Sequence, residues 1–408
     1  MRDATELATD QPVDAIVVTG DIAFSGKREE YEIAIDWLEN LCEAIGCPVE
    51  NVWLVAGNHD VDRSVIDSSV LLRDLHEKLR SAATENLDSV IRECITDEMG
   101  AKLLYAPLEN YNEFASRFVC AIDANQPFWE TDLTLNDGSI LRLRGLNSTL
   151  VSDSLDDQGA HRMVLGTAQV LMKVEEGVEF LTLCHHPPSW LLDQDESESY
   201  LTQRARLQLY GHKHKFQTDR INNSVRLEAG AVHPSRREQN WDPRYNYVVL
   251  KVENTDETRT LAVDIRPRVW HKEQKSFGPH PDLAGEFSRR HDLQLSAWAA
   301  PTLDASLDVG VEELKEPDAS ARPESGGRPV NRERRLVYRF LSLPYPKRLT
   351  IAQRLGLIED EDDVLRGREL DRQVLERARH AGRLGELWDE VVGSNSSSAE
   401  SQNPFDLG

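Results

Sequence analysis

The chain has 408 residues, with 47 Lys and Arg against 71 Asp and Glu, so its net charge at pH 7 is −24. At roughly 100–200 residues per domain, this length predicts two or three domains with a buried core. No apolar run approaches the ~18 residues of a membrane helix, which excludes an integral membrane protein. The acidic balance opposes attraction to phosphate backbones, so nucleic acid is disfavoured as a substrate unless a basic patch or bound cations offset it.

The cysteines and the first residues predict a cytoplasmic protein. The five cysteines contain no C-x-x-C pair, so the sequence encodes neither a disulfide framework nor a zinc knuckle. We therefore expect reduced, buried thiols. Residues 1–12 carry three acidic side chains and lack the apolar segment that a secretory signal requires.

The first part of the chain has a strand, helix, strand pattern. Residues 13–21 form an apolar, β-branched run that ends in Gly and Asp, which is typical of a buried strand. Apolar residues at three- and four-residue steps over 31–45 predict an amphipathic helix that ends near Gly46. Residues 52–55 predict a second strand, followed by AGNHD. In such βαβ units, functional sites gather at the carboxyl ends of the strands.

The pattern continues as one α/β domain to about residue 291. Residues 64–117 are mostly helical in pattern, and 133–148 predict a hairpin that turns at Asn136-Asp137-Gly138. Further strands are expected at residues 180–184, 207–210, 245–252 and 260–270.

The remaining residues predict a second, smaller unit. Residues 292–330 are rich in Pro, Gly, Ser and acidic residues and predict a flexible linker. Two apolar faces within 331–393 predict a small helical bundle. Residues 394–408 are low in complexity, and we expect a disordered tail.

Four polar clusters each follow an apolar, strand-like run: Gly20-Asp21, Gly57-Asn58-His59-Asp60, His185-His186-Pro187-Pro188 and Gly211-His212-Lys213-His214. Carboxylate, amide oxygen and imidazole ligands suit Zn, Mn, Fe and Co ions. A carboxylate can also bridge two cations that activate a water and clamp a phosphoryl group. Each cluster alone is typical of a surface turn. Their order and their strand context together favour a metal site.

In this order, GD, GNHD, HHPP and GHxH resemble the motifs of the calcineurin-like metallophosphoesterase superfamily over roughly residues 13–270. GDIAFSG and GNHDVDR are most similar to the branch that includes cyclic-nucleotide phosphodiesterases. The resemblance implies an α/β fold, a four-layer α/β/β/α sandwich with a metal centre at the strand ends. The small all-α domain at the C-terminus would follow this sandwich in the chain.

The resemblance also implies the metal ligands. Asp21 would bridge two divalent ions, each Mn, Fe, Zn or Co. Asn58, His185 and His212 would complete the shell of one ion, and His214 would bind the other. Between the adjacent histidines of HHPP, the family pattern favours the first as the ligand.

Residues next to these expected ligands have other expected roles. His59 would contact the phosphate or protonate the leaving oxygen, as a cationic imidazole beside the metals can. Asp60, directly after it, could orient that imidazole. For His186 two interpretations stay open, a substrate contact and a core histidine.

The sequence departs from the family pattern in the D-x-H motif that precedes GD and supplies most of the second ion's ligands. Residues 1–19 contain no histidine. Asp74-Leu75-His76 matches the D-x-H pattern, but it lies in a helical pattern. Residues two apart on a helix point about 200° apart, so we interpret this match as a decoy that does not bind metal. Two hypotheses remain: a natural start upstream of this chain, which we favour, or an incomplete second metal site.

Residues 331–393 contain neither a metal cluster nor a nucleophile with a base. They are similar to the small helical effector-associated adaptor domains of bacterial conflict and signalling proteins. The similarity rests on the Leu-Gly-Leu turn at 355–357, the acidic run 359–363 and the closing LWDEV. It implies a protein partner. The alternative is a solvated helical appendage that aids folding or dimerisation.

Together these patterns predict a metal-dependent enzyme that hydrolyses a phosphodiester, such as a cyclic nucleotide, or a phosphomonoester. P-loop, Rossmann and serine-hydrolase motifs are absent from the sequence. Two alternatives stay open. One is a metal-dependent nuclease, which the net charge disfavours. The other is a scaffold whose phosphoesterase site has decayed and which acts through its helical domain.

Overall fold

The computed structural model describes residues 1–156, 162–232, 242–255, 258–281, 285–299, 331–359, 362, 364–394 and 403–406. Its first βαβ unit confirms the predicted one. β1 (Ile16–Val18) pairs in parallel with β2 (Val52–Leu54), and α2 (Arg28–Ile45) connects them. α2 ends where Gly46 adopts φ 65°, a left-handed conformation that costs glycine little because it has no Cβ.

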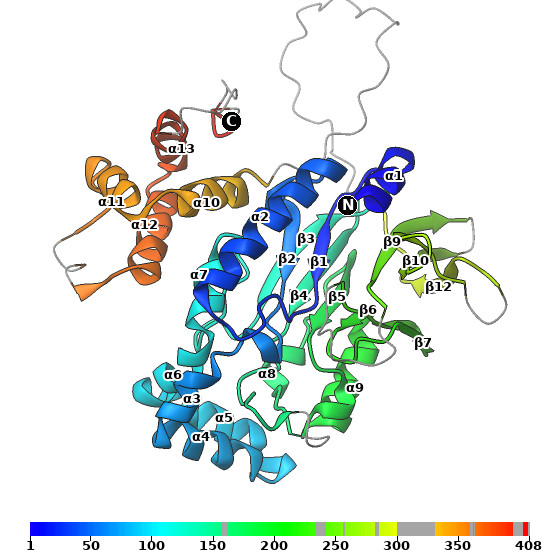
Figure 1. The fold of residues 1–408 in the computed structure, drawn as a ribbon, viewed down its shortest axis with the longest axis horizontal. Coiled ribbons are helices and arrows are strands. Elements are labelled where there is room, and N and C mark those ends of the chain that lie inside the picture. The colour runs from blue at the N-terminus through cyan, green and yellow to red at the C-terminus, as the bar shows by residue number, and fades with distance from the viewer. Residues whose placement is uncertain are drawn as a thin grey trace, which may run out of the picture.

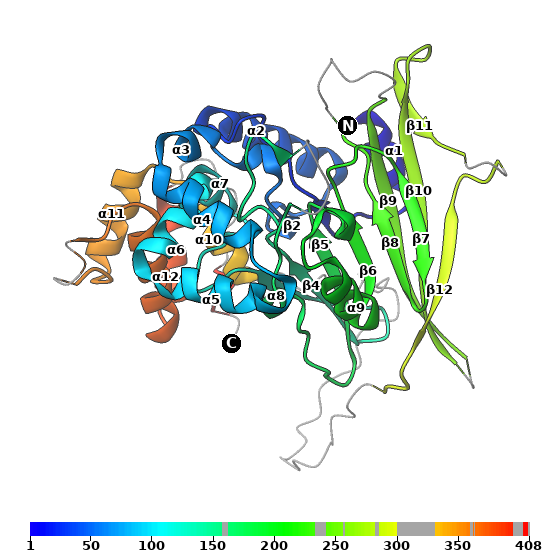
Figure 2. The ribbon, with the colours of Figure 1, turned by 90° about the horizontal axis from the view of Figure 1, so that it is seen from below.

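Five helices follow β2 and confirm the predicted helical stretch: α3 (Arg63–Ser68), α4 (Val70–Arg80), α5 (Leu87–Thr96), α6 (Glu98–Tyr105) and α7 (Glu109–Ser116). With α2 they gather on one side of the sheets (Figures 1 and 2). Each buries a few apolar residues in a common core, among them Leu72, Leu79 and Leu104. None of the described helices is long and apolar enough to cross a membrane.

Two larger sheets form the centre of the first domain. A six-stranded sheet has the order β3-β4-β5-β6-β8-β7. Its strands are β3 (Trp129–Thr134), β4 (Ile140–Gly145), β5 (Val178–Cys184), β6 (Ala205–Tyr210), β7 (Gln217–Ile221) and β8 (Ser224–Glu228). β3 and β4 form the predicted hairpin, and β4, β5, β6 and β8 run parallel.

The second sheet packs against the first (Figure 2). β10 (Arg259–His271) pairs with β9 (Arg244–Asn254), β11 (Ser276–Pro279) and β12 (Arg289–Leu295). Its residues Leu261, Val263 and Ile265 share one core with residues of β6 and the helices. The predicted domain end at residue 291 therefore falls inside a strand, and the sheet continues to Leu295.

α1 (Arg2–Asp10) lies on the opposite face of this second sheet. Its Asp3 carboxylate accepts hydrogen bonds from Tyr245 on β9 and Arg268 on β10. Side chains alternate between faces along a strand, and Arg268 is out of phase with the core residues of β10. α8 (Thr167–Val170) and α9 (Gln194–Arg204) cover the other face of the six-stranded sheet, where Val170 and Leu201 share a core with Phe180 of β5. The layers are thus α8 with α9, the six-stranded sheet, the second sheet and α1, which confirms the predicted α/β/β/α sandwich.

The C-terminal helices form the predicted all-α unit: α10 (Arg332–Ser342), α11 (Tyr345–Arg354), α12 (Arg368–His380) and α13 (Leu384–Gly393). They enclose a core of their own that includes Leu336, Phe340 and Trp388. The predicted linker lies outside the described residues from residue 300 to 330. Within the predicted disordered tail, Asn403 donates a hydrogen bond of 2.9 Å to the Gly385 carbonyl, so this part of the tail packs against α13.

α10 also joins this unit to the first domain. Arg334 is buried and donates hydrogen bonds to the carbonyls of Glu50 (2.8 Å), Val52 (3.0 Å) and Phe118. Its guanidinium lies 5.2 Å from the ring centre of Trp53. The helical unit is therefore anchored to the backbone at the start of β2.

Candidate metal centre

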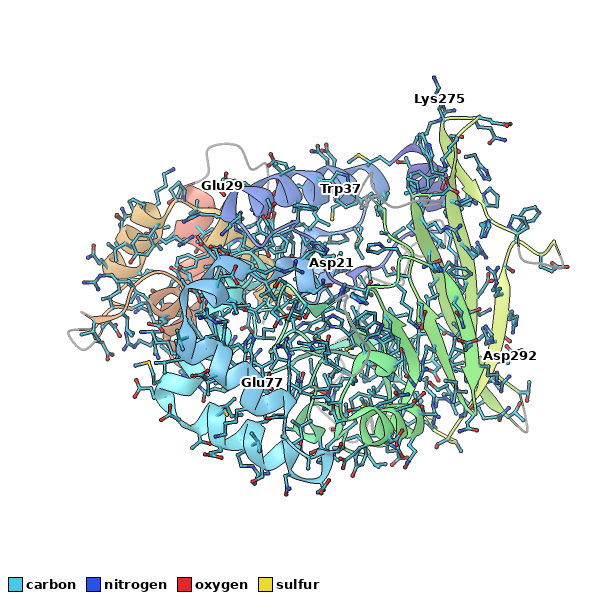
Figure 3. The ribbon with its side chains drawn as sticks, turned by 60° about the horizontal axis from the view of Figure 1, so that its bottom comes forward. Asp21, Glu29, Trp37, Glu77, Lys275 and Asp292 are labelled. Carbon is cyan, nitrogen blue, oxygen red and sulfur yellow. The ribbon has the colours of Figure 1, made fainter. Side chains whose placement is uncertain are left out.

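The turns after β1, β2, β5 and β6 meet at one place and bring the predicted ligands together. The Asp21 Oδ1 atom accepts the His59 backbone N–H at 3.0 Å and lies 3.4 Å from His185 Nε2. Its Oδ2 atom lies 3.9 Å from His214 Nε2. The Asp21 side chain is 17% exposed, whereas Glu77 on α4 is exposed; both are labelled in Figure 3.

Asn58 connects the motifs from the middle of this group. Its side chain is only 1% exposed. The Oδ1 atom lies 3.0 Å from His185 Nε2 and 3.1 Å from His212 Nδ1. One amide oxygen and two imidazole nitrogens from three separate turns thus point toward a common position, as the ligands of one ion would.

Glycines let these turns come so close. A Cβ at Gly57 would lie 2.2 Å from Asp21 Oδ1, and a Cβ at Gly211 would lie 2.5 Å from the Thr19 carbonyl oxygen. Both distances are far inside van der Waals contact. The glycine that precedes a ligand in these motifs is therefore needed for packing between the turns.

The backbone is strained at three of the candidate ligands. Asp21, His212 and His214 have φ values of 56°, 64° and 52°, in the left-handed region that side chains with a Cβ rarely adopt. Such conformations cost of order 1–3 kcal/mol each and cluster at functional sites. The strain is an indication of a site that is independent of the motif pattern.

The protonation states at the site suit metal binding. Burial raises the pKa of the Asp21 carboxyl, but the charge of His185 and a hydrogen bond with His214 lower it more, so the net pKa lies well below its usual value. Burial lowers the pKa of His185. Burial and then the neighbouring His185 lower the pKa of His212 to about 3. Ionised carboxylates and neutral imidazoles are the forms that coordinate metals.

The structure corrects the role expected for Asp60. Its fully buried carboxylate accepts the backbone N–H groups of Ala23 (2.9 Å) and Gly57 (2.8 Å) and the Tyr31 hydroxyl (3.1 Å). It therefore fixes the turn after β1 to the turn after β2. Among the described residues it makes no hydrogen bond to the His59 ring, because its lone pairs face the two turns.

The His59 ring is instead oriented by Phe24. His59 Nδ1 lies 2.8 Å from the Phe24 carbonyl oxygen, and the two rings stack with centres 5.6 Å apart. The Phe24 side chain is 72% exposed. The sequence motifs do not single out Phe24, although an aromatic residue three positions after Asp21 is a signal that could have found it.

Burial distinguishes between the interpretations of His186 and of the D-x-H match at Asp74-Leu75-His76. His186 is fully buried, with Nδ1 2.9 Å from Ser148 Oγ, which disfavours the predicted substrate contact. In the decoy, Asp74 is exposed on α4 while His76 is buried, so the two side chains point apart as the helical geometry predicts.

Comparison with known proteins agrees with this geometry. A family model described as calcineurin-like phosphoesterase matches residues 2–216, just over half of the chain. A model described as GTPase-associated adaptor domain (GAAD) matches residues 332–392. No match was found among curated proteins.

Among solved structures, a single-site variant of Vps29 from Entamoeba histolytica is 14% identical over 29% of this chain and 69% of that chain, with a TM-score of 0.17. A double variant of the same protein is 10% identical with the same coverage and TM-score. Such scores are too low to relate the folds, so the assignment rests on the family models and the site. The chain belongs to the calcineurin-like phosphoesterase family and carries a small helical adaptor domain after its phosphoesterase domain.

Proposed function

We propose that this chain hydrolyses a phosphodiester, such as a cyclic nucleotide, or a phosphomonoester, with the help of divalent metal ions. The observation that carries the proposal is the convergence of four turns on Asn58, whose side-chain oxygen lies 3.0–3.1 Å from nitrogens of His185 and His212 beside the ionised Asp21. This donor set of carboxylate, amide oxygen and imidazole fits Mn, Fe, Zn or Co.

In this proposal Asn58, His185 and His212 hold one ion, and Asp21 is shared with a second ion next to His214. Ions at these positions would polarise the phosphoryl oxygens and lower the pKa of a water. The second position is the poorer one. Among the described residues, a group of three or more His, Cys, Asp or Glu side chains that could hold an ion occurs only at His185, His186 and His212.

His59 is proposed to assist the leaving group. A carbonyl can only accept, so His59 Nδ1–H donates to Phe24, and Nε2 remains for the substrate. The ring is only partly buried, so a substrate can reach it. When the ring is protonated at both nitrogens, it can give the Nε2 proton to the leaving oxygen, which offsets the negative charge that develops there and leaves a neutral imidazole.

The test is hydrolysis of bis(p-nitrophenyl) phosphate and p-nitrophenyl phosphate with added Mn²⁺, Co²⁺ or Zn²⁺. We expect His59→Ala to lower kcat by about 10²- to 10⁴-fold, the usual contribution of general acid catalysis. His380→Ala, at an exposed position on α12, is the matched control and should keep the parent rate. Equal rates for His59→Ala and the parent would contradict the role of His59.

A nucleotide substrate is favoured by Phe24. Its exposed ring lies beside His59, where a base could stack on it, and base–aromatic stacking contributes roughly 1–3 kcal/mol. We expect Phe24→Ala to raise KM for a cyclic nucleotide about tenfold or more and Phe24→Tyr to restore it. Faster turnover of single-stranded DNA than of any cyclic nucleotide would favour the nuclease alternative.

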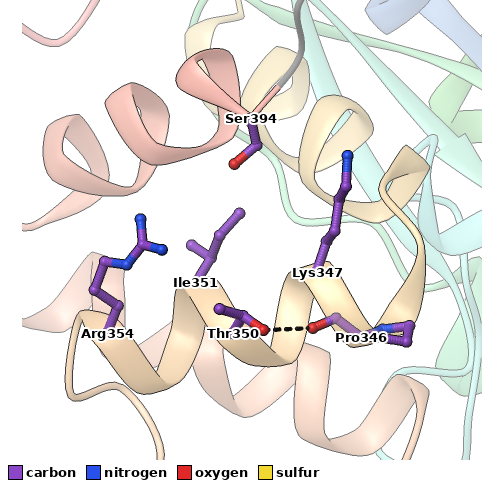
Figure 4. A pocket seen from close by; sticks show the side chains of 6 residues that line it. All are labelled: Pro346, Lys347, Thr350, Ile351, Arg354 and Ser394. Carbon is purple, nitrogen blue, oxygen red and sulfur yellow. Dashed lines mark hydrogen bonds between the residues drawn. The ribbon is translucent and has the colours of Figure 1, made fainter.

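We further propose that the adaptor domain brings the enzyme to a protein partner of a GTPase system, as the description of its family suggests. A pocket between α11 and the end of α13 is open to such a partner (Figure 4). It is lined by Pro346, Lys347, Thr350, Ile351, Arg354 and Ser394. In a pull-down, the full chain should retain a GTPase-containing protein and Lys347→Glu should not.

Absence of any retained partner would leave the helical appendage as the better interpretation of this domain. Partner binding without any phosphoester hydrolysis would favour the scaffold alternative.

A further inference from the structure

His186 occupies a position that neither a substrate contact nor ordinary core packing explains. Its side chain is fully buried, and its ring lies 4.8 Å from that of His185 and 4.7 Å from that of His212, measured between ring centres. Nδ1 bonds Ser148, but Nε2 is buried with no hydrogen-bond partner among the described residues. A buried polar atom without a partner is destabilising and needs an explanation.

Three ring nitrogens, one each from His185, His186 and His212, lie within 4.8 Å of one another. Nitrogen ligands at 2.0–2.1 Å from a tetrahedral ion are about 3.4 Å apart. Small rotations of these rings would therefore bring the three nitrogens to ligand spacing. An ion between them would also give His186 Nε2 the partner that it lacks.

We propose that His186 Nε2 is a further ligand of the ion held by Asn58, His185 and His212. The proposal rests on the proposed metal-binding function of this site and changes the composition of its ligands. Three imidazoles make the position rich in nitrogen, so Zn²⁺, Co²⁺ and Fe²⁺ are preferred over Mg²⁺ and Ca²⁺.

Ser148 prepares His186 for this role. Its hydroxyl oxygen accepts the His186 backbone N–H at 3.2 Å and has a second lone pair for Nδ1–H at 2.9 Å. With the proton on Nδ1, the lone pair of Nε2 is free for a metal. Histidine ligands generally donate their other ring N–H in this way, and His185 does so to the Thr19 carbonyl at 2.8 Å.

His76 shows that a buried imidazole without hydrogen-bond partners is not by itself a ligand in this chain, so the case for His186 rests on the grouping of the three ring nitrogens. It is 2% exposed, and both ring nitrogens lack hydrogen-bond partners among the described residues. It lies on α4, and no group of possible metal ligands found among the described residues includes it. It is therefore a matched control for the loss of a buried imidazole.

The experiment is titration of the metal-free full chain with Co²⁺, followed by calorimetry and by the visible absorption of the bound ion. His186→Phe keeps the ring volume and removes the ligand atom, and should weaken Co²⁺ binding at least about 100-fold and change the absorption. Ser148→Ala should weaken binding by roughly 10- to 100-fold, the usual effect of losing the partner of a histidine ligand. His76→Phe should bind Co²⁺ as the parent does.

A folded His186→Phe protein with parent-like Co²⁺ affinity and absorption would overturn the proposal. If that variant does not fold, Ser148→Ala decides, since unchanged affinity there would overturn it equally. The readout is separate from catalysis. Loss of Co²⁺ binding in a chain whose parent hydrolyses no phosphoester would support the ligand assignment while the proposed hydrolysis fails.

Discussion

The candidate metal centre and the anchor of the helical domain bury polar groups in opposite ways. At the candidate metal centre, the imidazoles of His185 and His212 and the Asn58 oxygen face one another. At the anchor, the Arg334 guanidinium is surrounded by carbonyl oxygens from Glu50, Val52 and Phe118. Buried groups whose partners are all present stabilise a fold. Buried groups directed at one another across a strained backbone indicate a place for a ligand.

The two regions are joined by one strand. Arg334 binds the carbonyl of Val52, the first residue of β2, and β2 leads directly into the turn that carries Asn58 and His59. The residues that hold the helical domain and those that face the metal position are thus only a few residues apart. Changes at either end can show how far the two regions depend on each other.

The largest expected effect is at Gly57. In Gly57→Ala the new Cβ would lie 2.2 Å from Asp21 Oδ1 and 2.3 Å from the Asp21 backbone nitrogen, so the turns must separate. We expect metal affinity to fall at least about 100-fold and the free energy of unfolding to fall by about 3 kcal/mol. Calorimetric titration and urea unfolding measure both.

The matched control is Gly393→Ala at the end of α13, where a Cβ would meet nothing within 4 Å. It should leave metal affinity unchanged and raise the free energy of unfolding by up to about 1 kcal/mol. Normal metal binding in Gly57→Ala would show that the turns need not touch.

The next largest effect is expected at Arg334, which anchors the helical domain to β2. Arg334→Met keeps most of the side-chain volume but leaves buried carbonyls without donors, at roughly 1–3 kcal/mol each. We expect the free energy of unfolding to fall by about 3 kcal/mol. Hydrogen exchange should also show loss of protection in β2. Arg366→Met, at an exposed position, should have little effect. Unchanged exchange in β2 would show that the helical domain is not coupled to the metal turn.

The features that the sequence predicts are those that depend on residues close to one another in the chain. The turns with Asp21 and Asn58 were predicted because each follows its strand directly and carries a glycine that the packing requires. Hydrogen bonds between residues distant in sequence were not predicted. Asp60 accepts the backbone N–H of Ala23, which lies 37 residues away. Arg334 donates to carbonyls about 280 residues away, at the start of β2 and just before it. Nothing in a local pattern specifies such tertiary hydrogen bonds.

His76 tests this comparison, because its ring nitrogens are buried without hydrogen-bond partners in the described part of the chain, although it lies away from the candidate metal centre. Burial and then the charge of Arg80 lower its pKa to about 4, against a smaller opposing effect of Asp153. The unfolded chain takes up this proton near pH 6.5 and so binds more protons between pH 6.5 and 4. The free energy of unfolding should therefore be full above pH 6.5 and fall by up to about 3 kcal/mol as the pH drops toward 4.

Urea unfolding at pH 7 and pH 5 checks this expectation. His76→Phe should remove that part of the pH dependence, because no proton can bind at the position. If the parent and His76→Phe lose stability equally between the two pH values, the imidazole is not the titrating group.

The smallest effects are expected at two buried asparagines. Because Asn403 lies in the helical domain and Asn58 at the candidate metal centre, they compare the two regions with the same residue type. Asn403 donates to the Gly385 carbonyl and to Asp389, each at 2.9 Å, and accepts the Phe405 backbone N–H at 2.9 Å. Its amide has complete partners within the protein. Asn403→Ala should lower the free energy of unfolding by about 1 kcal/mol and leave Co²⁺ affinity unchanged.

Asn58→Ala should instead lower Co²⁺ affinity and change the free energy of unfolding little. Its side-chain oxygen faces nitrogens of His185 and His212, so its removal takes a donor from the metal position. We expect the metal-free chain to unfold within about 1 kcal/mol of the parent, while Co²⁺ affinity falls at least about tenfold. If instead Asn58→Ala destabilises the metal-free chain as much as Gly57→Ala does and still binds Co²⁺ normally, Asn58 is a structural amide like Asn403, and facing polar atoms in this fold do not mark a ligand site.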